Sequence, residues 1–249
     1  MRLTPPPGFT QLVPLDTERH RGLTRREPGS FRFARDLGAV PLTVDEFFHA
    51  LRHYPIVFAG DDPGRPATPL ALTALDPRHN LFVDGSGCWR AGCYVPALLR
   101  AWPFYAVDVP QGPHAGEALV CVDESGLAPG KPALFDASGA ASVTCLREQR
   151  FVEELASAQR RTARFVATLA DLGLLEPLEA QAFPANGRSP QRLVGLLRVS
   201  EARLNRIPET PLREMMRRGE LARIYAHLLS LDNFADLLAN GDAENRHGS

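Results

Sequence analysis

Short apolar runs divide the first half of the chain and limit how it can fold. Gly, Pro and Asp residues separate neighbouring runs, and the separations are shorter than the crossover helices that join parallel strands. The pattern therefore favours an antiparallel or mixed β-sheet over βαβ units. The strands predicted from these runs cover residues 56–59, 70–75, 81–83, 88–95, 104–109 and 118–122, with 133–135 as a minor candidate.

The character of the sequence changes after Ser142. Between Leu146 and Leu172, apolar residues recur at alternating spacings of four and three, which predicts one long amphipathic helix. Gly173 follows it in the position of a C-terminal cap. The remaining predicted elements are a strand over 193–199, a short helix after Ser200 that ends at Pro208, and helices from Pro211 and over 220–231, divided at Gly219.

These patterns predict an α+β protein, with an antiparallel or mixed β-sheet in the N-terminal half packed against C-terminal helices. Residues 1–145 are predicted to form a β-rich region with an N-terminal arm, and residues 146–249 a mainly helical region. We expect the two to share one core.

Three local patterns add detail to the N-terminal region. Residues 12–15 and 31–34 are predicted to be short strand fragments that hold the arm against the domain. Thr43 and Glu46 have the spacing of a capping box at the start of a short helix that ends at Tyr54.

Composition excludes several classes of protein. The formal net charge of −1 provides no general attraction to nucleic acid or to an anionic membrane, so no nucleic-acid partner is expected. No apolar segment approaches the roughly 20 residues that a spanning helix needs. The N-terminus lacks the apolar region of a secretory signal, so a cytoplasmic location is expected, with the cysteines as free thiols.

The sequence lacks the familiar signatures of catalysis, cofactor binding and metal binding. There is no GxSxG, GxGxxG or Walker pattern, and no HxH, HExxH or CxxC, so we expect no cofactor and no metal. His49 and His53 are four apart on the short helix, but they are interpreted as surface residues. Cys88 and Cys93 are five apart on a predicted strand, so their side chains should point to opposite faces of it. We interpret them as two independent small core residues.

The segment from Asn80 to Phe104 is the most distinctive part of the sequence. Its turn residues, Asp84 to Gly87, separate two apolar runs as in a β-hairpin, and Pro96 precedes a short helical turn at 97–101. Aromatic and Arg side chains at this density suit either a binding surface or a stacked core. The candidate binding residues are Arg90, Tyr94, Arg100 and Trp102.

Two interpretations of the arginines in this segment remain open. Arg90 and Arg100 could hold a carboxylate or phosphate through a bidentate fork near Tyr94. Alternatively, they form structural ion pairs with Asp84 or Asp108, since Arg–carboxylate pairs are common in folded proteins.

The leading hypothesis is a non-catalytic accessory or binding protein that recognises a peptide or protein partner through the 89–104 surface. The alternative is an enzyme of unknown reaction, acting for example on peptides, with a site near Tyr94, Arg100 and His227, and with Glu201 as a further candidate. A third hypothesis is a self-assembling component of a surface layer. No catalytic residue is assigned.

Several segments, which together cover nearly the whole chain, carry a resemblance to a known family: 54–58, 80–84, 89–100, 103–104, 195–209 and 217–234, with His20-Arg21 and Phe33-Ala34 upstream. In these segments the chain resembles the SapC family of bacterial proteins, which is named for a surface-array locus. Where the family tends to carry an acidic Gly-Glu-x-Leu-Phe motif, this chain has Gly130 to Phe135 without the acid.

The resemblance implies a link to surface-layer presentation or export, and to outer-membrane receptor and flavin-halogenase genes. It implies no catalytic residue. A membrane permease shares the family's name, but the absence of a spanning segment distinguishes this chain from it.

Overall fold

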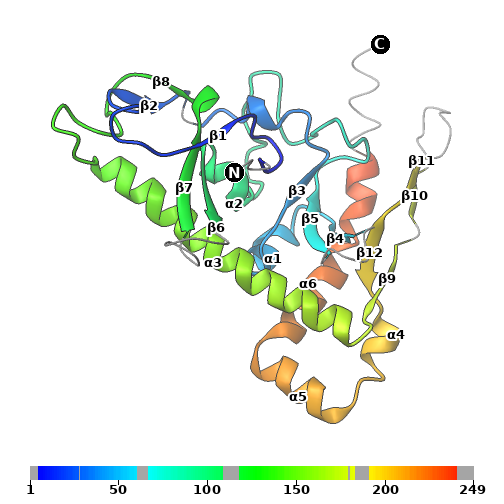
Figure 1. Ribbon diagram of the computed structural model, residues 1–249. Coiled ribbons are helices and arrows are strands. Elements are labelled where there is room, and N and C mark those ends of the chain that lie inside the picture. Colours follow the sequence, from blue (N-terminus) through cyan, green and yellow to red (C-terminus); the bar gives the residue numbers. More distant parts are fainter. Residues whose placement is uncertain are drawn as a thin grey trace.

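The computed structural model describes residues 5–27, 29–60, 67–108, 118–178, 180–182 and 191–239. Antiparallel sheets come mostly from the N-terminal half and helices from the C-terminal part, so the protein is α+β as predicted (Figure 1). The strands are β1 (Leu12–Pro14), β2 (Leu23–Arg25), β3 (Ala39–Pro41), β4 (Ile56–Ala59), β5 (Thr68–Leu72), β6 (Phe104–Asp108), β7 (Ala118–Asp123), β8 (Leu127–Pro129), β9 (Leu175–Pro177), β10 (Ala180–Ala182), β11 (Gln191–Leu193) and β12 (Leu196–Val199). The helices are η1 (Arg32–Ala34), η2 (Val44–Glu46), α1 (Phe47–Ala50), α2 (Ala97–Ala101), η3 (Glu124–Gly126), α3 (Val143–Asp171), α4 (Glu201–Leu204), α5 (Glu209–Arg217) and α6 (Glu220–Ser230).

A five-stranded antiparallel sheet joins residues from both halves of the chain. Its strand order is β3-β5-β4-β12-β9, with β4 at the centre. Ile56, Val57 and Phe58 of β4 are completely buried, as expected for an uninterrupted apolar strand. Strand β12 pairs with β4 through Leu197 opposite Phe58, so a C-terminal strand completes the N-terminal sheet.

A second sheet holds the N-terminal arm. Its order is β1-β7-β6, with Val13 opposite Val122. The arm is also fixed by Asp123, whose carboxylate accepts hydrogen bonds from the Thr10 amide (2.6 Å) and from the Thr10 hydroxyl (3.1 Å). The prediction that 12–15 holds the arm as a strand is therefore confirmed for β1.

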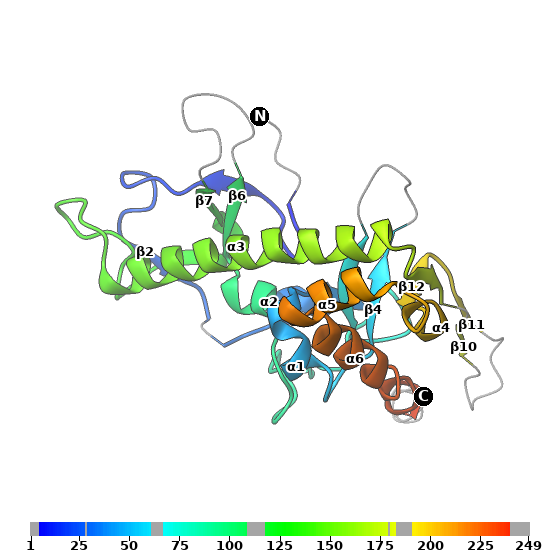
Figure 2. The same ribbon diagram turned by 90° about the horizontal axis from the view of Figure 1, so that it is seen from below.

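Helix α3 is 29 residues long and passes along both sheets (Figure 2). Ser142 caps its start by accepting the Cys145 amide at 3.2 Å, and Gly173 follows its end with φ of 61°. Leu155 and Ala156 pack into the cluster under the three-stranded sheet, whereas Phe165, Val166 and Leu169 pack into the cluster under the five-stranded sheet.

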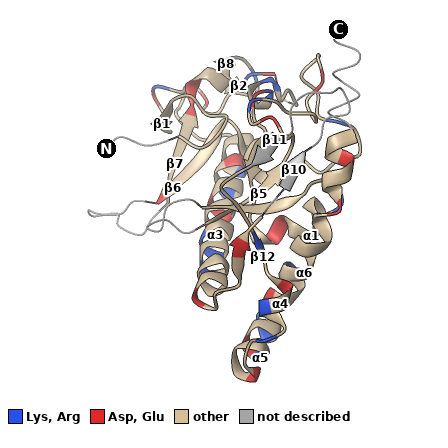
Figure 3. Ribbon diagram, turned by 90° about the vertical axis from the view of Figure 1, so that its right-hand side faces the viewer, with Lys and Arg blue, Asp and Glu red and all other residues tan. Residues whose placement is uncertain are grey.

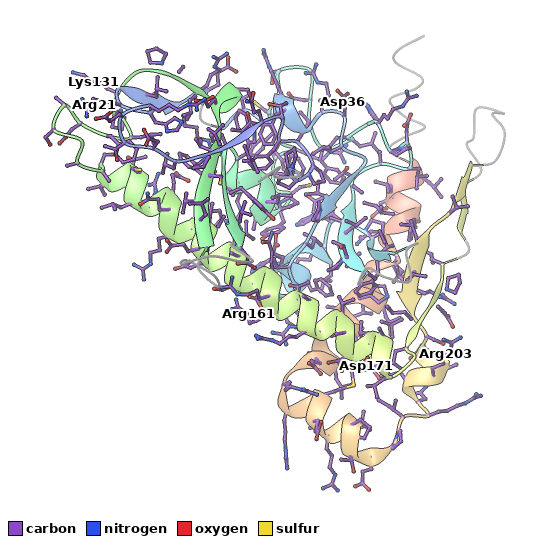
Figure 4. The ribbon with its side chains drawn as sticks, in the orientation of Figure 1. Arg21, Asp36, Lys131, Arg161, Asp171 and Arg203 are labelled. Carbon is purple, nitrogen blue, oxygen red and sulfur yellow. The ribbon has the colours of Figure 1, made fainter. Side chains whose placement is uncertain are left out.

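Charges lie mainly outside these cores. Figure 3 shows Lys/Arg and Asp/Glu residues of both signs along α3 and α5, while the strands are mostly free of them. Arg161 on α3 pairs with Asp45 at 2.6 Å, and Arg203 on α4 donates to the carbonyl oxygens of Gly173 and Leu175 beside the C-terminal end of α3 (Figure 4). The first contact connects the long helix to η2, and the second connects the segment after its end to α4.

The predicted 80–104 hairpin is wrong in its strands. The turn forms, but only the isolated bridge between Val83 and Trp89 follows it, and no strand covers 81–83 or 88–95. The reason is local: the Asp84 carboxylate accepts the amides of Ser86 (2.8 Å) and Cys88 (2.9 Å), and Gly92 has φ of 77°. These conformations bend the chain away from an extended ladder.

Two smaller predictions also need correction. Residues 31–34 hold a 3₁₀ helix instead of a strand, because Ala34 and Arg35 donate to the carbonyls three residues back. Residues 133–135 contribute only isolated bridges from Phe135, to Arg21 and to Ala141.

Candidate functional site

Tyr94 lies at the centre of the candidate site, in the loop that leads into α2. The Tyr54 hydroxyl accepts a hydrogen bond from the Trp89 indole nitrogen (3.2 Å) and donates to the Tyr94 carbonyl, which fixes the loop from beneath. Trp89 is half-buried and packs edge-on against Phe31. The loop is irregular in backbone but anchored at both ends.

Glu46 supports Tyr94 from the start of the short helix. Its Oε2 accepts the Thr43 amide (2.8 Å), which is the carboxylate bond of the predicted capping box, and also accepts the Thr43 hydroxyl (2.9 Å). Its Oε1 accepts the Ala97 amide (2.7 Å) and the Tyr94 hydroxyl (3.1 Å). One buried carboxylate therefore ties the helix start to the loop and to α2.

Burial and the Glu46 charge raise the pKa of Tyr94 to about 12. The phenol is therefore protonated at neutral pH and donates its hydrogen to Glu46. The same oxygen accepts a hydrogen bond from Arg100 Nη2 at 3.1 Å. The three side chains form a continuous line from the interior to the surface.

Arg100 is held in one orientation although it is exposed. Its Nε donates to the Val95 carbonyl (3.1 Å) and its Nη2 to the Tyr94 hydroxyl. The guanidinium carbon lies 5.6 Å from the Tyr94 ring centre and 5.3 Å from that of Phe151 on α3. Within the described part of the chain nothing bonds Nη1 or pairs a carboxylate with this arginine, so the end of its fork is open.

His49 contributes a second aromatic contact. Its ring stacks on Tyr94 at 5.3 Å between centres and 19° between planes. His53 instead packs against Tyr54, and burial lowers its pKa. Because α1 ends at Ala50, His53 lies beyond the helix, and the two histidines have different neighbours. The described residues contain no cluster of His, Cys, Asp or Glu suited to a metal ion.

Arg90 and Trp102 have neighbours other than Tyr94 and Arg100. Arg90 donates to the Leu81 carbonyl (3.2 Å) and lies 5.0 Å from the Phe82 ring centre. Trp102 is only 9% exposed and stacks on Phe33 at 4.2 Å, so it fills the interior. The four candidate binding residues therefore separate into one linked pair, Tyr94 with Arg100, and two packing residues.

The predicted structural ion pairs do not form. Asp84 is occupied by its own turn, and Asp108 pairs with Arg160 on α3 at 2.8 Å. Neither carboxylate is bonded to Arg90 or Arg100 in the described residues.

His227 belongs to the core of the five-stranded sheet. Its Nδ1 donates to the Ile56 carbonyl (2.8 Å) and its Nε2 accepts the Val199 amide (3.0 Å). Burial lowers its pKa to about 4, so the ring is neutral at pH 7. Both ring nitrogens are used by the backbone of β4 and β12, which leaves neither for acid–base work. Glu201 is exposed at the start of α4.

All four cysteines are free thiols. Cys88 is exposed and Cys93 half-buried, while Cys121 and Cys145 are buried. Burial raises the pKa of Cys93, Cys121 and Cys145, the opposite of what a reactive thiolate needs.

The role of Glu46 in this site was not predictable from the sequence. The capping box placed its carboxylate at a helix start, but the pairing with Tyr94 spans 48 positions. No local pattern signals such a contact.

Comparison with known protein families finds a match to SapC over residues 15–237 of the 249-residue chain. The chain belongs to the SapC family. No curated protein and no solved structure matches this SapC chain. Among the described residues of this SapC protein, no helix is both long enough and apolar enough to cross a membrane.

Proposed function

We propose that this SapC protein is a non-catalytic binding protein that recognises a peptide or protein partner at Tyr94 and Arg100. The observation that carries the proposal is the open end of the Arg100 fork. On one side of the guanidinium, Nε donates to the Val95 carbonyl and Nη2 to the Tyr94 hydroxyl. Nη1 and the second Nη2 hydrogen have no partner among the described residues, and the side chain is exposed. A partner carboxylate is the complementary group, because it accepts two parallel hydrogen bonds from such a fork.

Preorganisation supports the same proposal. Two rings and two hydrogen bonds already restrict the guanidinium, so a partner would immobilise little additional side-chain freedom on binding. On the family resemblance, we place the partner in a surface-layer or outer-membrane receptor system.

Binding to an array of random octapeptides tests the proposal. Each peptide is also made in a version without carboxylates, in which Asn and Gln replace Asp and Glu and the C-terminus is amidated. We expect binders to lose affinity when their carboxylates are replaced. Arg100→Ala should weaken the selected peptides about tenfold or more, equivalent to roughly 1.4 kcal/mol. Arg100→Lys should recover only part, because an ammonium lacks the fork.

Arg164→Ala is the matched control, since it removes the same charge from an exposed position of α3. It should bind as the wild type does. If Arg100→Ala remains folded and binds the selected peptides with wild-type affinity, the proposal is wrong.

A further inference from the structure

A pocket of about 370 Å³ lies beside the Tyr94 site and shares Glu46 with it. It is bounded by β3 and η2, the start of β5, α2, β6 and α3. The volume falls in the range of small-molecule sites, a few hundred Å³ upward. Leu42, Pro69, Leu98 and Leu155 supply much of its wall, so the pocket is mainly apolar.

The buried charged and hydroxyl groups around the pocket are already engaged, whereas Thr68 is exposed. The Glu46 carboxylate accepts four hydrogen bonds from Thr43, Tyr94 and Ala97. The Thr162 hydroxyl donates to the Ala158 carbonyl (2.8 Å) and accepts the Val44 amide (2.9 Å). Among the described residues no positively charged side chain lines the pocket, so an anionic ligand would lose its hydration without gaining an ion pair from them.

Tyr105 and Gln159 are the half-buried polar groups of the pocket that have bonding capacity left. Gln159 Nε2 donates to the Tyr105 hydroxyl over a long 3.4 Å. Burial raises the pKa of Tyr105, so the phenol keeps its hydrogen, and no acceptor for that hydrogen lies within bonding distance among the described residues. Gln159 Oε1 likewise has no donor in that part of the chain. The pair presents one donor and one acceptor in an apolar wall.

We propose that this pocket binds a neutral, mainly apolar molecule that carries an amide group. The ligand carbonyl accepts from the Tyr105 hydroxyl and the ligand N–H donates to Gln159 Oε1, while a branched aliphatic group fills the leucine-lined part. The site is separate from the Arg100 surface and does not depend on the function proposed for that surface.

N-acetyl-L-leucinamide is the probe, and N-acetyl-L-leucine, which replaces the terminal amide by a carboxylate, is its charged counterpart. Titration by NMR with labelled leucine methyl groups reports on Leu42, Leu98 and Leu155. We expect saturable shifts at these methyls with the amide, and binding of the carboxylate weaker by about tenfold or more.

Gln159→Leu should weaken the amide about tenfold, because it removes both the donor and the acceptor at nearly constant volume. Gln149→Leu, the same change at a half-buried position of α3 outside the pocket, should not. Three results would each overturn the proposal. The first is the absence of shifts at the pocket methyls with roughly 20 mM amide, which corresponds to a binding free energy weaker than about 2–3 kcal/mol. The others are equal binding of the amide and the carboxylate, and wild-type affinity of Gln159→Leu for the amide.

Discussion

Replacing Glu46 by Gln tests how the candidate site is held together. The substitution keeps the shape of the side chain but converts one carboxylate oxygen into an NH₂ group. If the NH₂ takes the Oε1 position it faces the Ala97 amide, and if it takes the Oε2 position it faces the Thr43 amide. Either orientation therefore leaves one backbone N–H without its acceptor in a buried site.

The cost follows from the number and kind of bonds. A hydrogen bond to a charged group contributes roughly 1.5–3 kcal/mol, and one of the four is lost outright in each orientation. The remaining bonds lose their charge assistance, which accounts for about half the strength of such bonds. We expect Glu46→Gln to reduce the free energy of unfolding by about 3 kcal/mol, which lowers Tm by about 6–12 °C in a protein of this size.

Urea denaturation at pH 7, followed by circular dichroism, measures the effect. Glu153→Gln is the control, since it removes the same charge at an exposed position of α3. A double-mutant cycle with Tyr94→Phe should give a coupling energy of about 1 kcal/mol or more, as expected for groups in direct contact. If Glu46→Gln costs no more than Glu153→Gln, the four-bond account of this carboxylate is incorrect.

Two further predictions concern stability. The pKa of His227 is lowered from 6.5 to about 4 in the folded state, so the unfolded state binds the proton first as the pH falls. The contribution of the neutral ring to stability is complete above pH 6.5 and is lost towards pH 4, by up to about 3 kcal/mol. The urea midpoint of the wild type should therefore drop more between pH 7 and 5 than that of His227→Gln. A parallel pH dependence in the two proteins would contradict this. Gly126→Ala should lower the free energy of unfolding by about 1–3 kcal/mol, because the added Cβ would lie 2.5 Å from Pro103 Cβ and 2.8 Å from Trp102 Cζ2. Gly85→Ala is its control: nothing lies within 4 Å of the added Cβ, so it should be close to neutral in the same urea denaturation.

Local signals made much of the fold predictable. The alternating apolar spacings of α3 and its end at Gly173 depend on residues within a few positions of one another. The helix starts at Val143, three residues before the predicted Leu146, because Ser142 caps it. The capping box at Thr43 and Glu46 is equally local. The strands β4, β6 and β7 formed where apolar runs lay between turn residues.

The failures share a different cause. The run 88–95 has strand-like composition, but the Asp84 side chain and the positive φ of Gly92 organise its backbone, and composition does not report either. Tyr94 and Arg100 could be associated because they are close in sequence. Glu46 and Phe151 reach them only through tertiary packing, so the site as a whole was beyond prediction from the sequence.

Helix α3 is roughly 43 Å long at 1.5 Å per residue, and it packs against the clusters under both sheets. The five-stranded sheet also takes β12 and β9 from beyond that helix. A cut between residues 145 and 146 would therefore leave residues 1–145 without most of the helix that packs against their strands. It would leave residues 146–249 without the strands that this helix covers. We expect neither fragment to fold alone, and mixing the two should restore the native circular dichroism spectrum if each supplies what the other lacks.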